Sequence, residues 1–561
     1  MKRTHENYRV DSKENIRINK QICSAKNTKE LIDIYDNNKL NFNHINVSTI
    51  VNRYTKMSGN NEFIIKLIPL IIANLKDFKP QEITNLAWAF ATLNIRNVEL
   101  FELLAVETRC KIKDFKPQEI ANLARSFAAL NIENVELFDI LAKETLCKIK
   151  DFKPQEIANL AWPFVKLNIK NEELFELLAK ETLCKIKEFN TQSIANLARS
   201  FATLNIRNVE LFELLAKETL RKIKDFKPQE IVNSAWPFAK LNIKNEELFE
   251  FLAKETQCKI KDFKPQEITK LAWSFATLNI RNVELFELLA KEALCKIKDF
   301  NSQNLANLAW SFAKLNIMNI ELFELLAKET QYKIKDFNSI EITNLAWSFS
   351  TLNIRNVELF ELLAKETLSK IRSFNSQSIA NLARSFAALN IENVELFDIL
   401  AVETRCKIKD FKPQEISFLA WSFATLNIRN IELFDVLVVE IQRKIEDFNQ
   451  QGVTNLAWSF ATLDIRNEKL FDLLAVKTRH IIRKFNSQEI SNLVWSFATL
   501  NIRNIELFDV LVAETRYKIK DFKLQEIANL SWSLSTLSIR NDELFELLAE
   551  EIQHKIRDLS H

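Results

Sequence analysis

A segment of 37 residues recurs thirteen times, without insertion, in this chain of 561 residues. Three positions of the repeat hold Phe in nearly every copy and account for 38 of the 42 Phe. A segment this short cannot bury an apolar face by itself, so each copy must pack on its neighbours. The copies begin at Asp77, Asp114, Asp151, Glu188, Asp225, Asp262, Asp299, Asp336, Ser373, Asp410, Asp447, Lys484 and Asp521.

Each repeat has the pattern of two amphipathic helices joined by a short turn. In the first repeat Ile83, Leu86 and Phe90 fall on one face of a helix, and a second apolar face begins at Leu100 and Phe101. The sequence therefore predicts an all-α fold, an α-solenoid of 37-residue helix-turn-helix repeats.

The ends of both helices carry their own signals. Pro or Asn opens the first helix, and Glu489 stands where it can reach back to the backbone N–H of an Asn486 cap. Asn94 is expected to end the first helix in the left-handed conformation. Asn97 then caps the second helix, whose basic end at Lys111 suits the helix dipole.

The repeats divide the chain into four parts. Residues 1–20 are predicted to be a disordered basic segment, and residues 21–76 to be capping helices with a degenerate repeat. Residues 77–557 hold the thirteen repeats, and residues 558–561 form a C-terminal tail.

Composition excludes most enzyme architectures. The chain has only 2 Gly, whereas dinucleotide loops, phosphate loops and nucleophile elbows depend on Gly. The seven Cys form no C-x-x-C pair, and no partner set converges on His480 or His554. We expect a protein that is not an enzyme, with no catalytic residue, metal, cofactor or small-molecule substrate.

One column of the first helix holds every Trp of the chain, and three repeats replace Trp with Arg. Indole and guanidinium planes both stack on nucleobases. The alternative is that these side chains fill the groove between successive first helices. The stacking candidates are Trp88, Arg125, Trp162, Arg199, Trp236, Trp273, Trp310, Trp347, Arg384, Trp421, Trp458, Trp495 and Trp532.

Rotation at about 100° per residue places Asn85, Ala89 and Thr92 beside Trp88 on the face opposite the core. Asn is a poor helix former. Its recurrence there indicates either readout of RNA or a ladder of hydrogen bonds between adjacent helices. The column of Thr92 varies between Thr, Ala and Lys, which is typical of a readout position. The readout candidates are Asn85, Asn122, Asn159, Lys166, Asn196, Lys240, Lys270 and Lys314.

The turn between the two helices carries a cation in ten repeats of a chain whose net charge is only +3. This column, the basic rail, could follow a phosphate backbone. Solvation and pairing with Glu of the next repeat is the other interpretation. The phosphate candidates are Arg96, Lys170, Arg207, Lys244, Arg281, Arg355, Arg429, Arg466, Arg503 and Arg540.

The motif from Gln81 to Leu93, with Asn85 and Trp88 at its centre, resembles octotricopeptide and heptatricopeptide repeats. The segment from Asn43 to Thr49 resembles the entry of proteins that join such repeats to a RAP domain, although we expect no RAP domain in this chain. The resemblance spans about residues 21 to 557 and implies binding of single-stranded RNA in the control of its stability, processing or translation.

Two functions therefore stay open. The first is an RNA-binding helical-repeat protein in post-transcriptional control, and the second is a scaffold for other proteins or a bacterial effector. The sequence predicts an intracellular, reducing location without a membrane segment. That location is the cytoplasm in a bacterium, whereas the resemblance implies a mitochondrion or chloroplast although no clear transit peptide is present.

Overall fold

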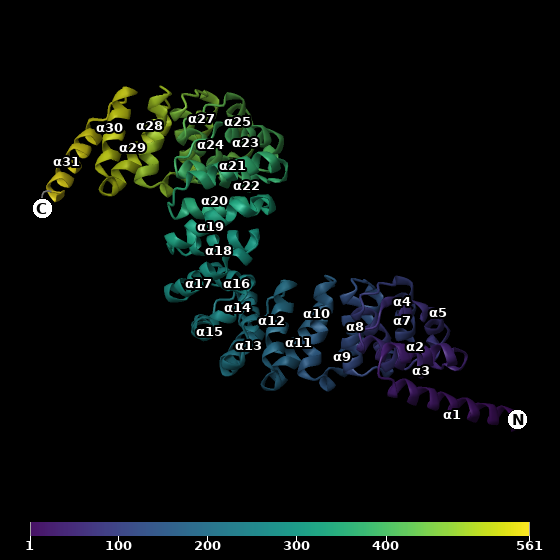
Figure 1. Ribbon diagram of the computed structural model, residues 1–561. Coiled ribbons are helices and arrows are strands. Elements are labelled where there is room, and N and C mark those ends of the chain that lie inside the picture. Colours follow the sequence, from purple (N-terminus) through teal and green to yellow (C-terminus); the bar gives the residue numbers. More distant parts are fainter. Residues whose placement is uncertain (1, 560–561) are drawn as a thin grey trace. The chain divides into compact units, whose positions relative to one another are not determined.

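The computed structural model describes residues 2–559 and the side chains of residues 13–557, and it contains no β-strand within those residues. The chain forms two compact units, residues 1–263 and 264–561. The boundary falls at the start of the sixth repeat. Within each unit the repeats stack as an α-solenoid of helix pairs, as predicted (Figure 1).

The first helices of the repeats are all 13 residues long. In the first compact unit they are α6 (Pro80–Thr92), α8 (Pro117–Ala129), α10 (Pro154–Lys166), α12 (Thr191–Thr203) and α14 (Pro228–Lys240). In the second compact unit they are α16 (Pro265–Thr277), α18 (Ser302–Lys314), α20 (Ser339–Thr351), α22 (Ser376–Ala388), α24 (Pro413–Thr425), α26 (Gln450–Thr462), α28 (Ser487–Thr499) and α30 (Leu524–Thr536).

The second helices alternate with them. They are α7 (Val98–Lys111), α9 (Val135–Lys148), α11 (Glu172–Lys185), α13 (Val209–Lys222) and α15 (Glu246–Lys259) in the first compact unit. In the second they are α17 (Val283–Lys296), α19 (Ile320–Lys333), α21 (Val357–Lys370), α23 (Val394–Lys407), α25 (Ile431–Lys444), α27 (Glu468–Ile481), α29 (Ile505–Lys518) and α31 (Asp542–Leu559). The predicted tail 558–561 thus begins inside α31, and residues 560–561 lie outside the described residues.

A single turn of 3₁₀-helix follows each second helix up to α29. These turns are η3 (Ile112–Asp114), η4 (Ile149–Asp151), η5 (Ile186–Glu188), η6 (Ile223–Asp225), η7 (Ile260–Asp262), η8 (Ile297–Asp299), η9 (Ile334–Asp336), η10 (Ile371–Ser373), η11 (Ile408–Asp410), η12 (Ile445–Asp447), η13 (Ile482–Lys484) and η14 (Ile519–Asp521).

Before the repeats, the chain forms α1 (Lys2–Ser24), α2 (Thr28–Asn38), η1 (Lys39–Asn41), α3 (His44–Lys56), α4 (Asn61–Lys66), α5 (Ile68–Ala73) and η2 (Leu75–Asp77). The predicted disorder of residues 1–20 is wrong for the described residues, because helix α1 occupies them. Ile18 and Ile22 of this helix are fully buried, and the Asn46 side chain of α3 donates a hydrogen bond to the Asn15 carbonyl at 3.0 Å.

The predicted caps are confirmed. Asn94 is left-handed with φ 53°, and every repeat has a left-handed residue at the same position. The Asn97 side chain accepts a hydrogen bond from the Leu100 N–H at 2.8 Å. Asn486 and Glu489 each accept a hydrogen bond from the other's backbone N–H, at 2.8 and 2.9 Å.

The Phe positions join successive repeats. Phe101 of α7 packs edge-on against Phe127 of α8, with ring centroids 4.8 Å apart, and both rings are fully buried. Phe286 of α17 and Phe312 of α18 repeat this contact at 4.9 Å. The aromatic excess of the sequence is therefore the core of the junctions between repeats.

A lysine at the end of each typical second helix also binds the repeat before it. Lys111 Nζ donates to the Lys76 and Phe78 carbonyls at 2.6 and 2.7 Å and pairs with Glu107 at 2.6 Å. Lys148 makes the equivalent bonds to the Lys113 and Phe115 carbonyls. Dipole complementarity is thus only part of the reason for the basic helix ends.

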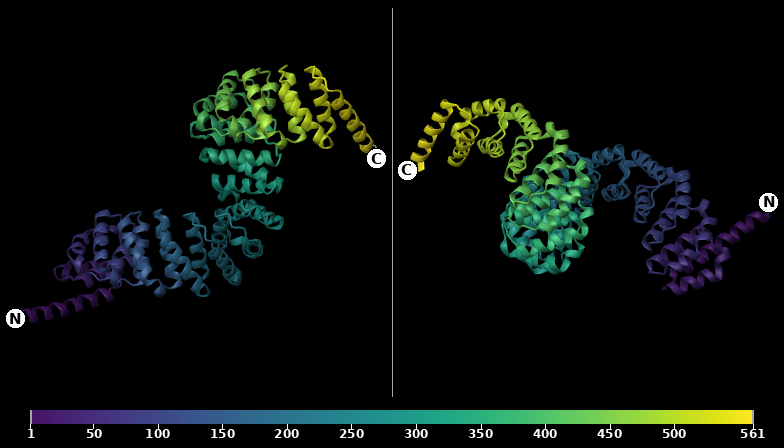
Figure 2. Two further views of the ribbon diagram at one scale, coloured as in Figure 1. Left: turned by 180° about the vertical axis from the view of Figure 1, so that it is seen from behind. Right: turned by 90° about the horizontal axis from the view of Figure 1, so that it is seen from above.

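Within each compact unit, the first helices of successive repeats pack closely against each other, whereas the second helices touch their successors at few positions. Each compact unit therefore brings its first helices together in one closely packed layer (Figure 2). This layer carries the columns that the sequence selected. None of the described helices combines the length and apolar character needed to cross a bilayer.

Candidate nucleic-acid interface

Three columns of the first helices form a stripe open to solvent. In α6 these are Asn85 and Trp88, which are half-buried, and Thr92, which is exposed. The same three columns are half-buried or exposed in all thirteen repeats. We call them the interface stripe. Within each compact unit, the structure therefore places the predicted stacking and readout candidates on an accessible face of the first-helix layer.

The expectation that Ala89 shares this face is wrong. Ala89 is fully buried, and Ser126 and Ser200 at the same column are also buried. Their hydroxyls donate to the Asn122 and Asn196 carbonyls of their own helices, both at 2.9 Å. The next first helix covers this flank, a contact that rotation about a single helix axis does not reveal.

The Asn side chains of the stripe form no ladder. Asn85, Asn122 and Asn159 are half-buried, and within the described residues no hydrogen bond joins the amide of one such Asn to the next first helix. The interhelical contact at this flank consists instead of the buried Ala and Ser column. The amides are thus left facing the solvent side of the layer.

The environment of the stacking column differs from repeat to repeat. Trp310 and Trp347 lie beside each other, with ring centroids 6.5 Å apart and planes tilted by 34°. The guanidinium of Arg384 lies over the Phe418 ring at 4.1 Å, and burial lowers the pKa of this arginine. Arg384 therefore already stacks on an aromatic ring of the protein itself.

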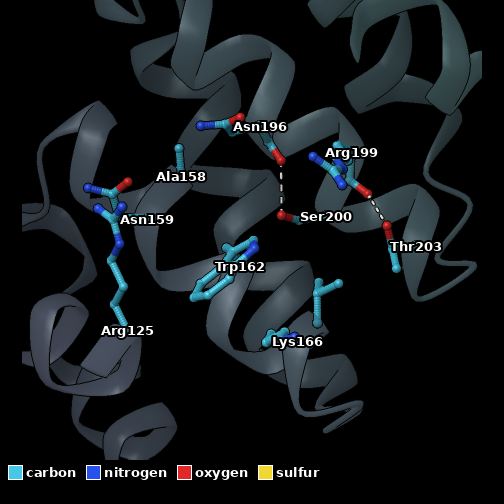
Figure 3. A pocket seen from close by; sticks show the side chains of 10 residues that line it. Arg125, Ala158, Asn159, Trp162, Lys166, Asn196, Arg199, Ser200 and Thr203 are labelled. Carbon is cyan, nitrogen blue, oxygen red and sulfur yellow. Dashed lines mark hydrogen bonds between the residues drawn. The ribbon is translucent and has the colours of Figure 1, made fainter. Parts of the chain in front are cut away.

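A pocket of about 440 Å³ opens on the stripe where α8, α10 and α12 lie side by side. Trp162 stands in its centre and is 37% exposed. Figure 3 shows Arg125 and Arg199 on opposite sides of this ring, and Lys166 extends from the same helix as Trp162. The pocket unites an aromatic face with three cations.

A smaller hollow of about 360 Å³ adjoins this pocket. Trp88 and Thr92 of α6 and Asn122 and Arg125 of α8 line it. Arg125 lines both hollows. The first four repeats thus alternate Trp and Arg along the stripe, and the two hollows follow that alternation.

The basic rail is exposed in all ten repeats that carry it. Lys244 and Arg466 pair with Glu246 and Glu468 of their own repeats, at 2.6 and 2.7 Å. These two cations therefore pair within their own repeat, and not with Glu of the next repeat as the alternative interpretation expected.

Two further rail residues contact the backbone of the next repeat. Arg355 donates to the Leu389 carbonyl at 3.3 Å, and Arg429 donates to the Asp464 carbonyl at 3.2 Å. Since the side chains stay exposed, these bonds hold the cations at the turn without removing them from solvent.

Several ion pairs with shifted pKa values lie away from the stripe, at contacts of the second helices. Burial by itself would raise the pKa of the Glu366 carboxyl, but hydrogen bonds from Lys335 and Lys370 outweigh it and hold the pKa below its usual range. Lys113 and Lys148 lower the pKa of the Glu144 carboxyl in the same way, against the opposing effect of burial. These shifts belong to the packing of successive repeats.

The described residues hold no cluster of three or more His, Cys, Asp or Glu arranged to bind a metal. The seven Cys are free and exposed. The interface stripe presents aromatic rings, amides and cations to solvent, and the rail presents further cations at the turns.

Sequence reasoning selected Arg125, Trp162, Arg199, Asn159 and Lys166 as separate candidates and missed that they share one pocket. The available signal was the order of the stacking column, in which this is the one Trp with Arg in both neighbouring repeats. Of the other candidates, Trp88 and Asn122 line the adjoining smaller hollow.

Three segments of the chain, residues 10–182, 180–402 and 395–561, match the family model described as RNA-editing substrate-binding complex 6 protein. No curated protein matches the chain. Among solved structures, the chain is similar to one titled a homology model of the full-length AP-3 complex in an intermediate open conformation. The identity is 12%, the match covers 96% of this chain and 93% of that one, and the TM-score is 0.36.

The family match supports the expected class of RNA-related helical-repeat protein, whereas the narrower resemblance to octotricopeptide and heptatricopeptide repeats stays a prediction. The three matched segments together span nearly all of the chain. The chain belongs to the RNA-editing substrate-binding complex 6 protein family.

Proposed function

We propose that this protein binds single-stranded RNA along the interface stripe and acts in post-transcriptional processing, as the substrate-binding and editing terms in the family name suggest. The observation that carries the proposal is the pocket in which Arg125 and Arg199 flank the exposed Trp162 ring. Aromatic faces stack on bases of any sequence, and cations hold the phosphates. The proposal assigns the chain no catalytic step and no cofactor.

Salt titration of RNA binding tests this proposal. The logarithm of the binding constant for a fluorescent single-stranded oligonucleotide should fall linearly with the logarithm of salt concentration, with a slope of about 0.7 for each phosphate contacted. Intrinsic Trp fluorescence should fall as bases stack on the stripe. A duplex of the same sequence should bind more weakly because its bases are paired. Equal affinity for strand and duplex, with unchanged fluorescence, would contradict the proposal.

The basic rail is tested separately. Changing Arg429, Arg466 and Arg503 to Glu should abolish RNA binding while leaving the helical circular dichroism unchanged, because all three side chains are exposed. The matched control changes three exposed Lys of the second helices by the same charge: Lys291→Glu, Lys328→Glu and Lys365→Glu. If both triple variants lose the same affinity, net charge and not the rail determines binding.

A second function, as a scaffold, is favoured by an apolar patch on three successive second helices. Val402, Val439 and Val476 are 42%, 50% and 40% exposed. Seven other repeats carry Lys at this column. Exposed apolar residues gathered on one face are typical of protein contacts, and the family name refers to a complex.

The triple variant Val402→Lys, Val439→Lys and Val476→Lys tests the scaffold function. Lys is native at this column elsewhere, so the fold should be kept. Proteins that copurify with the wild type from its native cell should be lost, and affinity for RNA should not fall. Retention of the same proteins would argue against this surface.

A further inference from the structure

The pocket around Trp162 differs from the rest of the stripe in how the ring is covered. In the neighbouring repeats of Trp310 and Trp347, the two Trp rings lie beside each other, with centroids 6.5 Å apart. Trp162 has Arg in both neighbouring repeats and is 37% exposed. Trp532 is more exposed, at 50%, but it belongs to the last repeat, where no further repeat covers it. Trp162 is exposed although a repeat packs on each side of its own.

The charge of the pocket is one-sided. Its cations are Arg125, Lys166 and Arg199, and no carboxylate is among the described residues that line it. The Ser200 and Thr203 hydroxyls donate to carbonyls of their own helix at 2.9 and 2.8 Å, so their protons are already engaged. Figure 3 shows both of these bonds.

The amides of Asn159 and Asn196 also line the pocket. They can present both donors and acceptors to a ligand because an amide carries each kind of group. The volume of about 440 Å³ lies within the usual range for sites that bind small ligands or single ligand groups.

We propose that the Arg125–Trp162–Arg199 pocket takes one internal nucleotide of a single-stranded RNA and fixes the strand's position along the repeats. The base stacks on Trp162, and the phosphates on its two sides are held by Arg125 and Arg199. The Asn159 and Asn196 amides contact the edge of the base. This inference rests on the proposed function and adds to it a single dominant subsite.

The order of the elements supports an internal nucleotide over a free one. Arg125, Trp162 and Arg199 come from the consecutive first helices α8, α10 and α12, so a cation stands on each side of the ring along the stack. A nucleotide within a strand has a phosphate on each side of its base, whereas a nucleoside monophosphate has one.

The test compares single variants in the full chain, using a fluorescent single-stranded oligonucleotide that binds the wild type. Trp162→Ala should weaken binding about five- to 150-fold, the range expected for one stacked base. Trp310→Ala, the comparator in the same column, should weaken it less than about fivefold. Trp162→Phe keeps a ring and should recover part of the loss.

Two exposed Arg provide a second measurement that does not depend on the indole. The double variant Arg125→Gln and Arg199→Gln should reduce the salt slope by about 1.4, for two lost phosphate contacts. Lys254→Gln is the control, because Lys254 is 61% exposed on a second helix and pairs with Glu250. Its slope should equal that of the wild type.

Crosslinking identifies the subsite directly. An oligonucleotide with 4-thiouridine should crosslink by ultraviolet light to the peptide that contains Trp162 more than to any peptide with another stacking Trp. An excess of uridine monophosphate should not displace the strand. Displacement by the free nucleotide would overturn the assignment of an internal nucleotide.

The outcomes separate the two proposals. If the wild type binds no single-stranded RNA, the proposed function fails. If the wild type binds but Trp162→Ala and Trp310→Ala lose equal affinity and the salt slope of the Arg double variant is unchanged, RNA binding stands and the dominant subsite is overturned. Circular dichroism and thermal unfolding establish whether each variant is folded. If Trp162→Ala does not fold, the salt slope of the Arg double variant decides whether the dominant subsite exists.

Discussion

At the residue scale, the thirteen turns between helices depend on a backbone conformation that glycine usually supplies. The chain has only 2 Gly, neither at this position, and uses Asn in most repeats instead. Asn tolerates the left-handed region because its short polar side chain can hydrogen-bond locally. The turn therefore depends on Asn at a position where most other residues would be strained.

Asn316, with φ 50°, allows a direct test. Asn316→Ala should reduce the free energy of unfolding by about 1–2 kcal/mol, because a Cβ is unfavourable in the left-handed region. Asn316→Gly is the matched control and should be nearly neutral, since Gly adopts this conformation freely. Urea unfolding followed by circular dichroism measures both variants, and equal loss in both would contradict the explanation.

The buried Phe rings are the second residue-scale feature. Phe286 is fully buried against Phe312. Phe286→Ala should cost about 3–5 kcal/mol of unfolding free energy because it leaves a cavity between two repeats. The control is Phe251→Ala, whose ring is 40% exposed on a second helix. Its effect should stay within about 0.5 kcal/mol, and a similar loss in both variants would show that the junctions do not depend on these contacts.

At the element scale, an ion pair can join the 3₁₀ turn after one second helix to the next second helix, and at one junction the two charges are reversed. Lys335 pairs with Glu366 of the next repeat at 2.7 Å. At the equivalent positions, Glu446 pairs with Lys477 at 3.1 Å. The Lys477 side chain is 8% exposed, so its charge needs a partner. The exchange of both residues together indicates that the pair itself is maintained.

A double-mutant cycle measures this pair. Glu446→Lys and Lys477→Glu should each lower stability because they place like charges beside each other. The double variant should recover much of the loss, with a coupling energy of about 1 kcal/mol. Additive losses in urea unfolding would mean that the two residues are independent.

The contribution of the Lys335–Glu366 ion pair to the free energy of unfolding should depend on pH, and the pKa shift gives the sign of that dependence. The pKa of the Glu366 carboxyl is lower in the folded state than its usual value, although burial opposes the shift, because Lys335 and Lys370 donate to the ionised form. Its contribution to stability is therefore present above the unfolded pKa and is lost as pH falls through the folded pKa.

Glu366→Gln should accordingly destabilise the protein near neutral pH by about 1–3 kcal/mol. The difference from wild type should shrink as pH falls below the ordinary carboxyl range near 4. Thermal unfolding across pH measures it. A difference that stays constant from pH 7 to pH 3 would show that the ionised form is not what stabilises the contact.

At the scale of the whole molecule, stability is the sum of repeats and of contacts between neighbours. Removal of one entire repeat, residues 299–335, should leave a folded chain, because the new junction joins the same positions as the old one. Removal of 302–319 deletes one helix of a pair and should expose buried Phe rings. Circular dichroism and dye binding to exposed apolar surface distinguish the two deletions, and equal disruption would contradict a stack of interchangeable repeats.

The sequence by itself determined the helix pair, its caps and the solvent-facing columns of Asn85, Trp88 and Thr92. These features follow from apolar spacing and from capping side chains that act within a few residues along the chain. Copies of one repeat must also make the same contacts with their neighbours, so the periodicity indicated a stack. The same short-range signals identified the exposed rail at Arg96 and its equivalents.

Only the tertiary structure decided which flank of the first helix is covered, so that Ala89 is buried, Lys111 binds carbonyls of the preceding repeat and α1 docks on α3. It also decided that Trp162 stands open between two Arg while Trp310 lies against Trp347. These features depend on the rotation between one repeat and the next. That rotation is set by packing between residues more than 30 positions apart, which helical periodicity does not encode.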